Sequence, residues 1–154
     1  MEKNQILGAC GLYCGACNHY RFSFTEGEHL LRDSNPKNLT YDKFTCRGCH
    51  SDKSEMLPGC AGCKIRECSK KKKISHCGSC NEFPCKLLTD FKNDGRIHHQ
   101  YILKNLQELN TKGVEQWLIE QENRWKCECG YNYSWYEESC YNCGMKLNSY
   151  KKSK

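Results

Sequence analysis

Residues 60–88 (CAGCKIRECSKKKKISHCGSCNEFPCKLL) contain two copies of a C-x2-C-x4-C arrangement of cysteines. The first copy is Cys60, Cys63 and Cys68, and the second, seventeen positions later, is Cys77, Cys80 and Cys85. Two cysteines separated by two residues place both sulfurs on one tight turn, where they can bind the same metal ion. Disulfides, metal centres and reactive thiols are the three kinds of chemistry that this segment predicts.

The expected redox environment favours metal ligation over disulfides. The first residues, MEKNQILGACGLYCGAC, have no basic stretch followed by an apolar one, so we expect no signal peptide. No apolar run approaches the length of a membrane span, so we expect no membrane association. We therefore expect a cytoplasmic protein, in which paired cysteines are typically metal ligands. The odd number of cysteines, 15, would also leave one thiol unpaired in an all-disulfide scheme.

The composition predicts a fold that depends on metal ions for stability. Leu, Ile, Val and Phe make up only 25 of the 154 residues, and the mean hydropathy is −0.86. This apolar fraction is below the roughly 20% under which disorder becomes a concern. Small domains with so little core commonly rely on disulfides or metals.

The distribution of cysteines divides the chain into three expected parts. Residues 1–95 hold eleven cysteines and are predicted to form a metal-knuckle domain, with short helices after the knuckles. Residues 96–125 contain no cysteine and are predicted to form a helical pair that packs on the first part. Residues 126–154 hold the last four cysteines and are expected to form a zinc ribbon with a basic tail. The predicted fold class is therefore a small metal-stabilised α+β fold, mostly helical.

The helical pair rests on apolar periodicity. Apolar residues recur at helical spacing over residues 102–109 and again over 114–125, with Gly113 between them. We interpret this segment as two antiparallel helices packing on the rest of the protein. His98 and His99 precede it, and we expect them to form a solvated helix start rather than a metal site.

The last four cysteines form the most specific single site in the sequence. They occur as Cys127-x-Cys129 and Cys140-x2-Cys143, with a glycine after each pair and the aromatic, strand-like segment YNYSWY between them. Two knuckles joined by short β-strands are typical of a zinc ribbon, which does not fold without its ion. The single residue between Cys127 and Cys129 departs from the usual two.

Several cysteine motifs resemble one family of bacterial and archaeal proteins, the family of Domain of Unknown Function 3795. The motifs that carry the resemblance are CGLYCGACNHY (10–20), CRGC (46–49), CAGCKIREC (60–68) and CGSCNEFPCKLL (77–88). The segment VEQWLIEQENRW and the cysteines after it also resemble the end of longer members. The resemblance implies zinc binding and transfers no catalytic role.

Spacing groups neighbouring cysteines but does not show which distant pairs share an ion. The pairs of the first part are Cys14/Cys17, Cys46/Cys49, Cys60/Cys63 and Cys77/Cys80. Because tetrahedral zinc takes four cysteines, the simplest scheme has two sites in these pairs and a third in the ribbon. The remaining Cys10, Cys68 and Cys85, with His76 or His50, would form a fourth site. In an alternative scheme, each C-x2-C-x4-C provides three ligands.

Zinc, at about three to four ions, is the main cofactor expectation. Four thiolates also hold [4Fe–4S] clusters, which are the alternative for the first part. The spacings match neither the bacterial nor the plant-type ferredoxin pattern.

The formal net charge of +6 and the run Lys70–Lys73 raise the possibility of nucleic-acid binding. Each zinc ion with four thiolates contributes a charge of about −2, so three sites would offset that excess. We expect the lysine run to be a solvated surface, and Arg66 or Lys64 to screen thiolates. Nucleic-acid contact remains the alternative.

Common catalytic motifs are missing, including the phosphate-binding glycine loops, H-E-x-x-H and G-x-S-x-G. Thiol chemistry is the best enzymatic hypothesis, because Cys85 lies at a predicted helix start beside Lys86, and Cys68 lies close to the lysine run. We expect both to be ordinary ligands. The sequence thus predicts a zinc-binding adaptor for an unidentified protein partner, with iron–sulfur or thiol-redox proteins and nucleic-acid-binding zinc proteins as alternatives.

Overall fold

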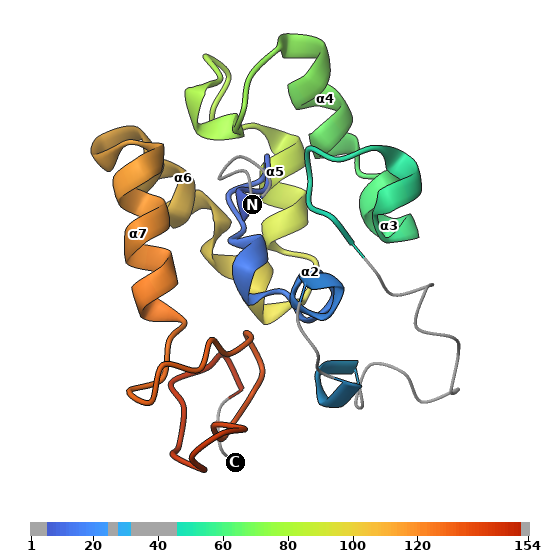
Figure 1. Cartoon of the computed structure of the whole chain (residues 1–154). Helices are drawn as coiled ribbons and strands as arrows, with labels where there is room; N and C mark the ends of the chain where they lie inside the picture. The colour runs from blue at the N-terminus through green and yellow to red at the C-terminus, as the bar shows by residue number, and fades with distance from the viewer. Residues whose placement is uncertain (1–5, 25–27, 32–45, 152–154) are drawn as a thin grey trace.

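A computed structural model describes residues 6–24, 28–31 and 46–151, which form a mostly helical fold (Figure 1). The α-helices are α2 (Asn18–Phe24), α3 (Pro58–Ala61), α4 (Lys64–Lys72), α5 (Lys86–Lys92), α6 (Ile102–Lys112) and α7 (Val114–Arg124). Short 3-10 helices lie between them: η1 (Cys14–Ala16), η2 (Glu28–Leu31), η4 (Lys53–Glu55), η5 (Cys77–Ser79) and η6 (Ile97–Tyr101). The expectation of a mostly helical protein with short helices is confirmed.

Short helices follow the cysteine turns directly. α2 begins after Cys17, α4 begins after Cys63, and α5 begins after Cys85. α4 ends at Lys72, and the next residue, Lys73, adopts a left-handed conformation with a φ of 55°. Each of these helices therefore sets the path of the chain directly after a cysteine.

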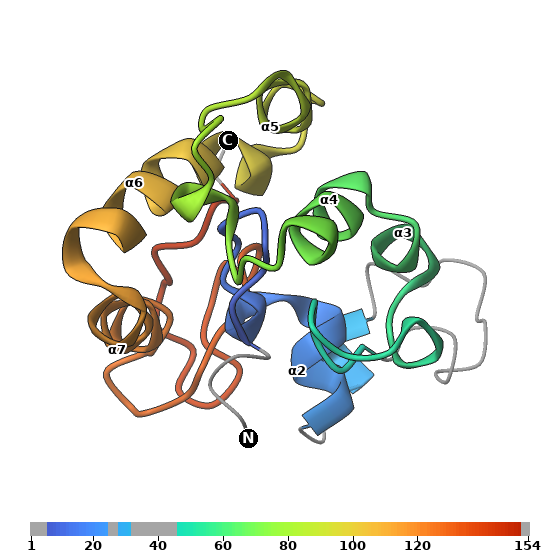
Figure 2. The same cartoon turned by 90° about the horizontal axis from the view of Figure 1, so that it is seen from above.

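The apolar stripe predicted over 102–109 builds α6. Ile102, Leu106 and Leu109 are at most 2% exposed. Gly113 ends this helix with a φ of 84°, a value that glycine adopts without strain. α7 follows at once and buries Trp117 completely. In Figure 2, α7 is seen nearly end-on while α6 runs across the view, so the two helices cross at an angle. Their antiparallel pairing stays a prediction.

A single hydrophobic core includes residues from all three predicted parts, among them Leu7, Leu106 and Tyr133. α6 lies against two cysteine turns at once. A Cβ atom on Gly11 would come within 2.8 Å of the Leu106 side chain, and one on Gly78 would come within 2.8 Å of the Leu106 carbonyl oxygen. The three-part division of the chain stays a prediction, but its parts share one core.

The tail after α7 contains isolated bridges rather than continuous strands within its described residues, which end at 151. The bridges join Lys126 to Asn132 and Ser139 to Lys146, both antiparallel. Sheet-like pairing is therefore limited to the bases of the two cysteine turns. The predicted short β-strands are not shown, and residues 152–154 of the predicted basic tail lie outside the described residues.

His98 and His99 are packed inside the protein, and the expectation of a solvated helix start is wrong. His98 stacks on Trp135 with ring centres 4.4 Å apart, and its Nδ1 lies 2.6 Å from the hydroxyl of Tyr136. His99 is 3% exposed and its Nδ1 lies 2.7 Å from a carboxylate oxygen of Asp94. His98 thus connects η6 to the tail, whereas His99 contacts Asp94 and stacks on Phe91 of α5.

No helix in the described part of the chain combines the length and the apolar character that crossing a bilayer requires.

Candidate metal centres

The last four cysteines lie on two similar turns, which we call the tail site (Cys127, Cys129, Cys140 and Cys143). The backbone N–H of Cys127 donates to the carbonyl of Tyr131, and that of Cys140 donates to the carbonyl of Met145, both at 2.8 Å. A glycine with positive φ follows each pair. The first turn closes one residue earlier than the second, and this is how the chain accommodates the single residue between Cys127 and Cys129.

The four sulfurs of the tail site all lie within 4.8 Å of one another. The Sγ atoms of Cys127 and Cys143 are 3.7 Å apart, and those of Cys129 and Cys140 are 3.5 Å apart. In a tetrahedral site with zinc–sulfur bonds of about 2.3 Å, sulfurs lie about 3.8 Å apart. The tail cysteines are therefore arranged so that they can hold one metal ion.

Electrostatics favours ionisation at Cys140. Burial tends to raise the pKa of this thiol. Hydrogen bonds from the backbone N–H groups of Cys143 and Asn142, and from neighbouring thiols, outweigh that effect and lower the pKa to about 7. A thiolate is the form that binds a metal ion. Cys140 is thus the most readily ionised ligand of this site.

The tail site is tied to the N-terminal cysteine turn. The backbone N–H of Trp135 donates to the carbonyl of Ala16 at 3.1 Å, and Ala16 lies between Cys14 and Cys17. An ion pair joins the guanidinium of Arg21 on α2 to the carboxylate of Glu137 at 2.8 Å. Both contacts are largely buried, so the tail is held rigidly against the first part.

Seven further cysteines form a second group, the N-terminal cluster (Cys10, Cys14, Cys17, Cys46, Cys49, Cys60 and Cys63). Burial and then the charges of four other members raise the pKa of Cys14 well above its usual range. Burial and four members likewise raise the pKa of Cys60 to about 12. Thiols whose charges raise one another's pKa in this way ionise more readily when a cation offsets their repulsion. This clustering is the arrangement expected of metal ligands.

Backbone N–H groups already point at sulfurs of the N-terminal cluster. The N–H of Ala9 donates to Cys49 Sγ at 3.4 Å, and that of Gly48 donates to Cys46 Sγ at 3.4 Å. Such bonds stabilise the charged form of a thiol more than its neutral form.

Arg66 is a buried cation beside this cluster. Its side chain is only 2% exposed. Nε donates to the carbonyl of Cys49 at 2.8 Å, and one terminal nitrogen donates to the carbonyl of Ser51 at 2.9 Å. The described residues include no carboxylate paired with it. Because a guanidinium stays charged and is costly to bury alone, its natural counter-charge is a group of thiolates.

A third group lines a cavity of about 260 Å³, which we call the Cys68 pocket. Its thiols are Cys68 on α4, Cys77 and Cys80 around η5, and Cys85 before α5. Burial and then the charges of Cys85, Cys68 and Cys80 raise the pKa of Cys77 to about 12. The ammonium of Lys72 donates to Cys80 Sγ at 3.3 Å and also pairs with Glu82. Lys72 is thus engaged within the protein, although it belongs to the predicted solvated run.

The groups differ from the simplest scheme drawn from spacing. Cys68 and Cys85 line the same cavity as Cys77 and Cys80. Cys10 instead belongs with the N-terminal cluster: after burial, the charge of Cys49 is the largest cause that raises the pKa of Cys10. The three cysteines left over in that scheme therefore do not gather in one place. Burial lowers the pKa of His76, and its buried Nδ1 has no hydrogen-bond partner among the described residues. Backbone groups of Leu7 and Ser75 bond His50. A part for either histidine in a metal site stays a prediction.

Sequence reasoning missed two asparagines that hold the cysteine turns to α6. Asn105 Nδ2 donates to the carbonyl of Gly11 at 2.9 Å. Asn110 Nδ2 donates to the carbonyl of Gly78 at 2.6 Å. Both asparagines lie at the border of the apolar stripe of α6, a place where a polar residue is easily mistaken for a solvated one.

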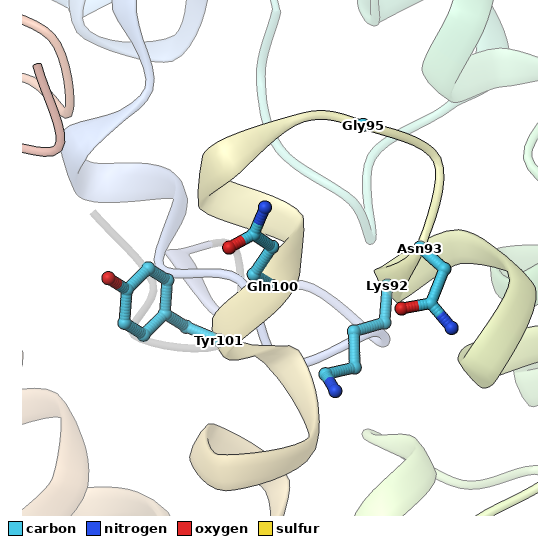
Figure 3. A pocket seen from close by; sticks show the side chains of 5 residues that line it. All are labelled: Lys92, Asn93, Gly95, Gln100 and Tyr101. Atoms are coloured by element: carbon cyan, nitrogen blue, oxygen red, sulfur yellow. The ribbon is translucent and has the colours of Figure 1, made fainter.

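A larger hollow of about 480 Å³ lies between α5 and η6 (Figure 3). It is lined by Lys92, Asn93, Gly95, Gln100 and Tyr101. None of these five side chains is a thiol or an imidazole, and in Figure 3 they are spread around the turn rather than converging on one point. The size of this hollow is therefore no guide to the chemistry of the protein.

Comparison with known proteins supports the family resemblance that the cysteine motifs indicated. A family model described as "Protein of unknown function (DUF3795)" matches residues 6–90, a range that includes the N-terminal cluster and the Cys68 pocket but not the tail site. A search of curated proteins and a search of solved structures found no match. Since more than half of the chain is matched, this protein belongs to the DUF3795 family.

Proposed function

We propose that the protein is a zinc-binding protein whose tail site is a structural zinc ribbon. The observation that carries this proposal is the gathering of four cysteine sulfurs within 4.8 Å of one another. Four cysteines complete the tetrahedral shell of zinc, and a shell without an open position is typical of structural rather than catalytic zinc. We propose that the protein acts as an interaction module whose tail requires the bound metal ion to stay folded.

The proposal extends to the N-terminal cluster, where seven thiols and the buried cation Arg66 meet. Seven ligands exceed what one zinc ion takes, so we propose that this cluster holds up to two ions with a shared thiolate. Bound zinc would supply the positive charge that buried thiolates need, and Arg66 would offset the excess negative charge of the centre.

Metal content and cobalt substitution test the tail site. Protein purified without oxygen should contain zinc, and replacing the zinc with Co²⁺ should give the absorption bands of a tetrahedral thiolate site. Cys140→Ser should remove one ion per chain, and Cys85→Ser, outside the tail site, should keep that ion. Full metal retention by Cys140→Ser, or a tail that stays folded in the presence of a strong chelator, would contradict the proposal.

An interaction role needs an exposed surface that the metal shapes. Tyr141 lies between the ligands Cys140 and Cys143 and is 64% exposed, and Met145 beyond them is 45% exposed. The Tyr141 ring stacks on His29 with ring centres 3.7 Å apart, which limits its motion. Rigid aromatic residues and methionine are enriched in protein interfaces.

Site-specific photo-crosslinking in cells tests the interaction role. A photoreactive residue at position 141 should give discrete crosslinked species that disappear when Cys140→Ser is added. The same residue at Glu128, on the other turn and also exposed, is the control. Equal crosslinking from both positions, or species that survive loss of the ion, would show that this surface has no specific partner.

A further inference from the structure

The Cys68 pocket differs from the tail site in the spacing of its sulfurs. Among the described residues, only the tail cysteines bring three or more ligand atoms within 4.8 Å of one another. The four thiols of the Cys68 pocket instead surround a cavity of about 260 Å³. A single zinc ion would require sulfurs about 3.8 Å apart. The described thiols of the N-terminal cluster also do not bring three sulfurs within 4.8 Å of one another. The feature that sets the Cys68 pocket apart is therefore the cavity between its four thiols.

The walls of this cavity are largely apolar. Besides the four thiols, the cavity is lined by five apolar side chains and by four polar or charged ones, which are Ile65, Ile74, Phe83, Leu87 and Leu88, and Ser69, Lys72, Glu82 and Lys86. Ile65 and Leu88 belong to the hydrophobic core and are at most 3% exposed. Such apolar walls limit the contact of an inorganic group with water, and the four thiolates are the soft ligands that iron prefers.

Charged side chains lie at the rim. Lys72, Lys86 and Glu82 line the pocket. Lys72 pairs with Glu82 and also donates a hydrogen bond to Cys80 Sγ at 3.3 Å, whereas Lys86 pairs with Asp90. Hydrogen bonds to cysteine sulfurs and nearby charge are the means by which proteins stabilise iron–sulfur clusters and set their reduction potentials. The lysine run of α4 thus has a local role that does not require nucleic acid.

We propose that Cys68, Cys77, Cys80 and Cys85 bind a [4Fe–4S] cluster in this cavity. Each thiolate would bind a different iron, which accounts for four sulfurs that stand apart around a space instead of meeting at a point. Binding releases the four thiol protons, and the cluster supplies the cations that compensate the thiolates. This inference is independent of the zinc proposed for the tail site and the N-terminal cluster.

Anaerobic purification followed by Mössbauer spectroscopy and sulfide analysis tests the assignment. Wild-type protein, reconstituted if necessary with ferric iron, sulfide and a thiol reductant that brings half of the iron to the ferrous state, should contain about four irons and four sulfides per chain with a [4Fe–4S] spectrum. Cys68→Ser should lose this spectrum. Cys143→Ser, in the tail site, should keep it while losing zinc. Zinc in place of iron in the pocket, or a [2Fe–2S] spectrum, would overturn the assignment.

Lys72→Met provides a test that does not depend on a ligand substitution. Its side chain is partly exposed, so the fold should tolerate the change. One-electron reduction by dithionite adds negative charge to the cluster, and the variant lacks the nearby cation that favours this state. Its reduction potential should therefore be lower than that of the wild type, whereas Lys71→Met on the exposed face of α4 should leave the potential unchanged. Equal shifts of the reduction potential in the two variants, or no shift in Lys72→Met, would show that the cluster does not lie in this pocket.

Discussion

Arg66 donates a hydrogen bond from Nε to the carbonyl oxygen of Cys49 at 2.8 Å, and its side chain is only 2% exposed. We expect Arg66→Met to preserve much of the volume and to lose this bond, the bond to Ser51 and the buried charge. Hydrogen bonds from charged groups contribute about 1.5–3 kcal/mol each, so the metal-loaded variant should lose about 3 kcal/mol of unfolding free energy in a denaturant titration.

The same variant should release metal from the N-terminal cluster faster in a chelator assay, because the negative charge of the centre is no longer offset. Arg47→Met is the matched control, since Arg47 lies in the same segment with a 57% exposed side chain. If Arg66→Met lost stability but held metal as tightly as the control, Arg66 would only organise the loop and would not balance thiolate charge.

Asn110 fixes the Cys77–Cys80 turn against α6 through its bond to the carbonyl of Gly78 at 2.6 Å. We expect Asn110→Ala to cost about 1 kcal/mol of unfolding free energy, the usual contribution of one such hydrogen bond. Thr111→Ala is the control, because the Thr111 hydroxyl bonds only the carbonyl of Gln107 within its own helix.

If Asn110 only stabilised the fold, its replacement would not change the reactivity of the thiols in the Cys68 pocket. We therefore expect Asn110→Ala to increase the rate at which Cys77 is alkylated in the metal-loaded protein, relative to the control. Equal alkylation rates in Asn110→Ala and Thr111→Ala would show that α6 supports the fold without positioning these thiols.

The local features of this protein could be predicted from its sequence better than the long-range contacts. The helix starts after Cys17 and Cys63 could be predicted, because a turn that places two sulfurs together leaves the chain free to begin a helix. The start near Cys85 could be predicted from Pro84, a residue favoured in the first turn of a helix. The grouping of thiols could not, since it depends on how α4, α5 and η5 pack, and spacing along the chain holds no information on that packing.

The histidines show the same limit. A polar pair before an apolar stripe is usually solvated. His98 is partly buried instead, because Trp135 and Tyr136, from a segment almost forty residues away, pack against its ring. Likewise, the strands expected in the tail reduce to isolated bridges, because each cysteine turn closes on itself within a few residues and leaves little extended chain to pair.

Gly11 is required by two independent features of the N-terminal cysteine turn. Its φ is 88°, and a Cβ atom there would lie 2.8 Å from Cγ of Leu106. A left-handed alanine costs about 1–2 kcal/mol and overpacking adds a similar amount. We expect Gly11→Ala to lose about 3 kcal/mol of unfolding free energy.

Gly59→Ala is the matched control for Gly11→Ala. Gly59 lies within α3, and a Cβ atom there would meet no atom within 4 Å. Alanine is favoured over glycine inside a helix by roughly 0.5–1 kcal/mol, so this variant should be as stable as the wild type or slightly more stable. Similar losses in the two variants would mean that neither the contact with α6 nor the backbone conformation limits position 11.

His98 should make the protein less stable as the pH falls. Burial, and then the nearby positive charges of His99 and Arg96, lower the pKa of His98 to about 3, against about 6.5 in the unfolded chain. Below pH 6.5 the unfolded chain therefore takes up a proton that the native ring refuses, so the contribution of His98 is full above pH 6.5 and declines as the pH falls toward 3.

A comparison of His98→Gln with the wild type isolates this effect. Glutamine does not titrate, and both proteins carry the same metal sites, so acid release of metal cancels in the difference between them. Between pH 6.5 and 5 the wild type should lose about 1–2 kcal/mol more unfolding free energy than the variant. The ring signals of His98 in an NMR titration should stay those of a neutral imidazole throughout this range. A ring that protonates near pH 6.5 in the folded protein would mean that its stacking on Trp135 and its bond to Tyr136 do not hold it in the neutral form.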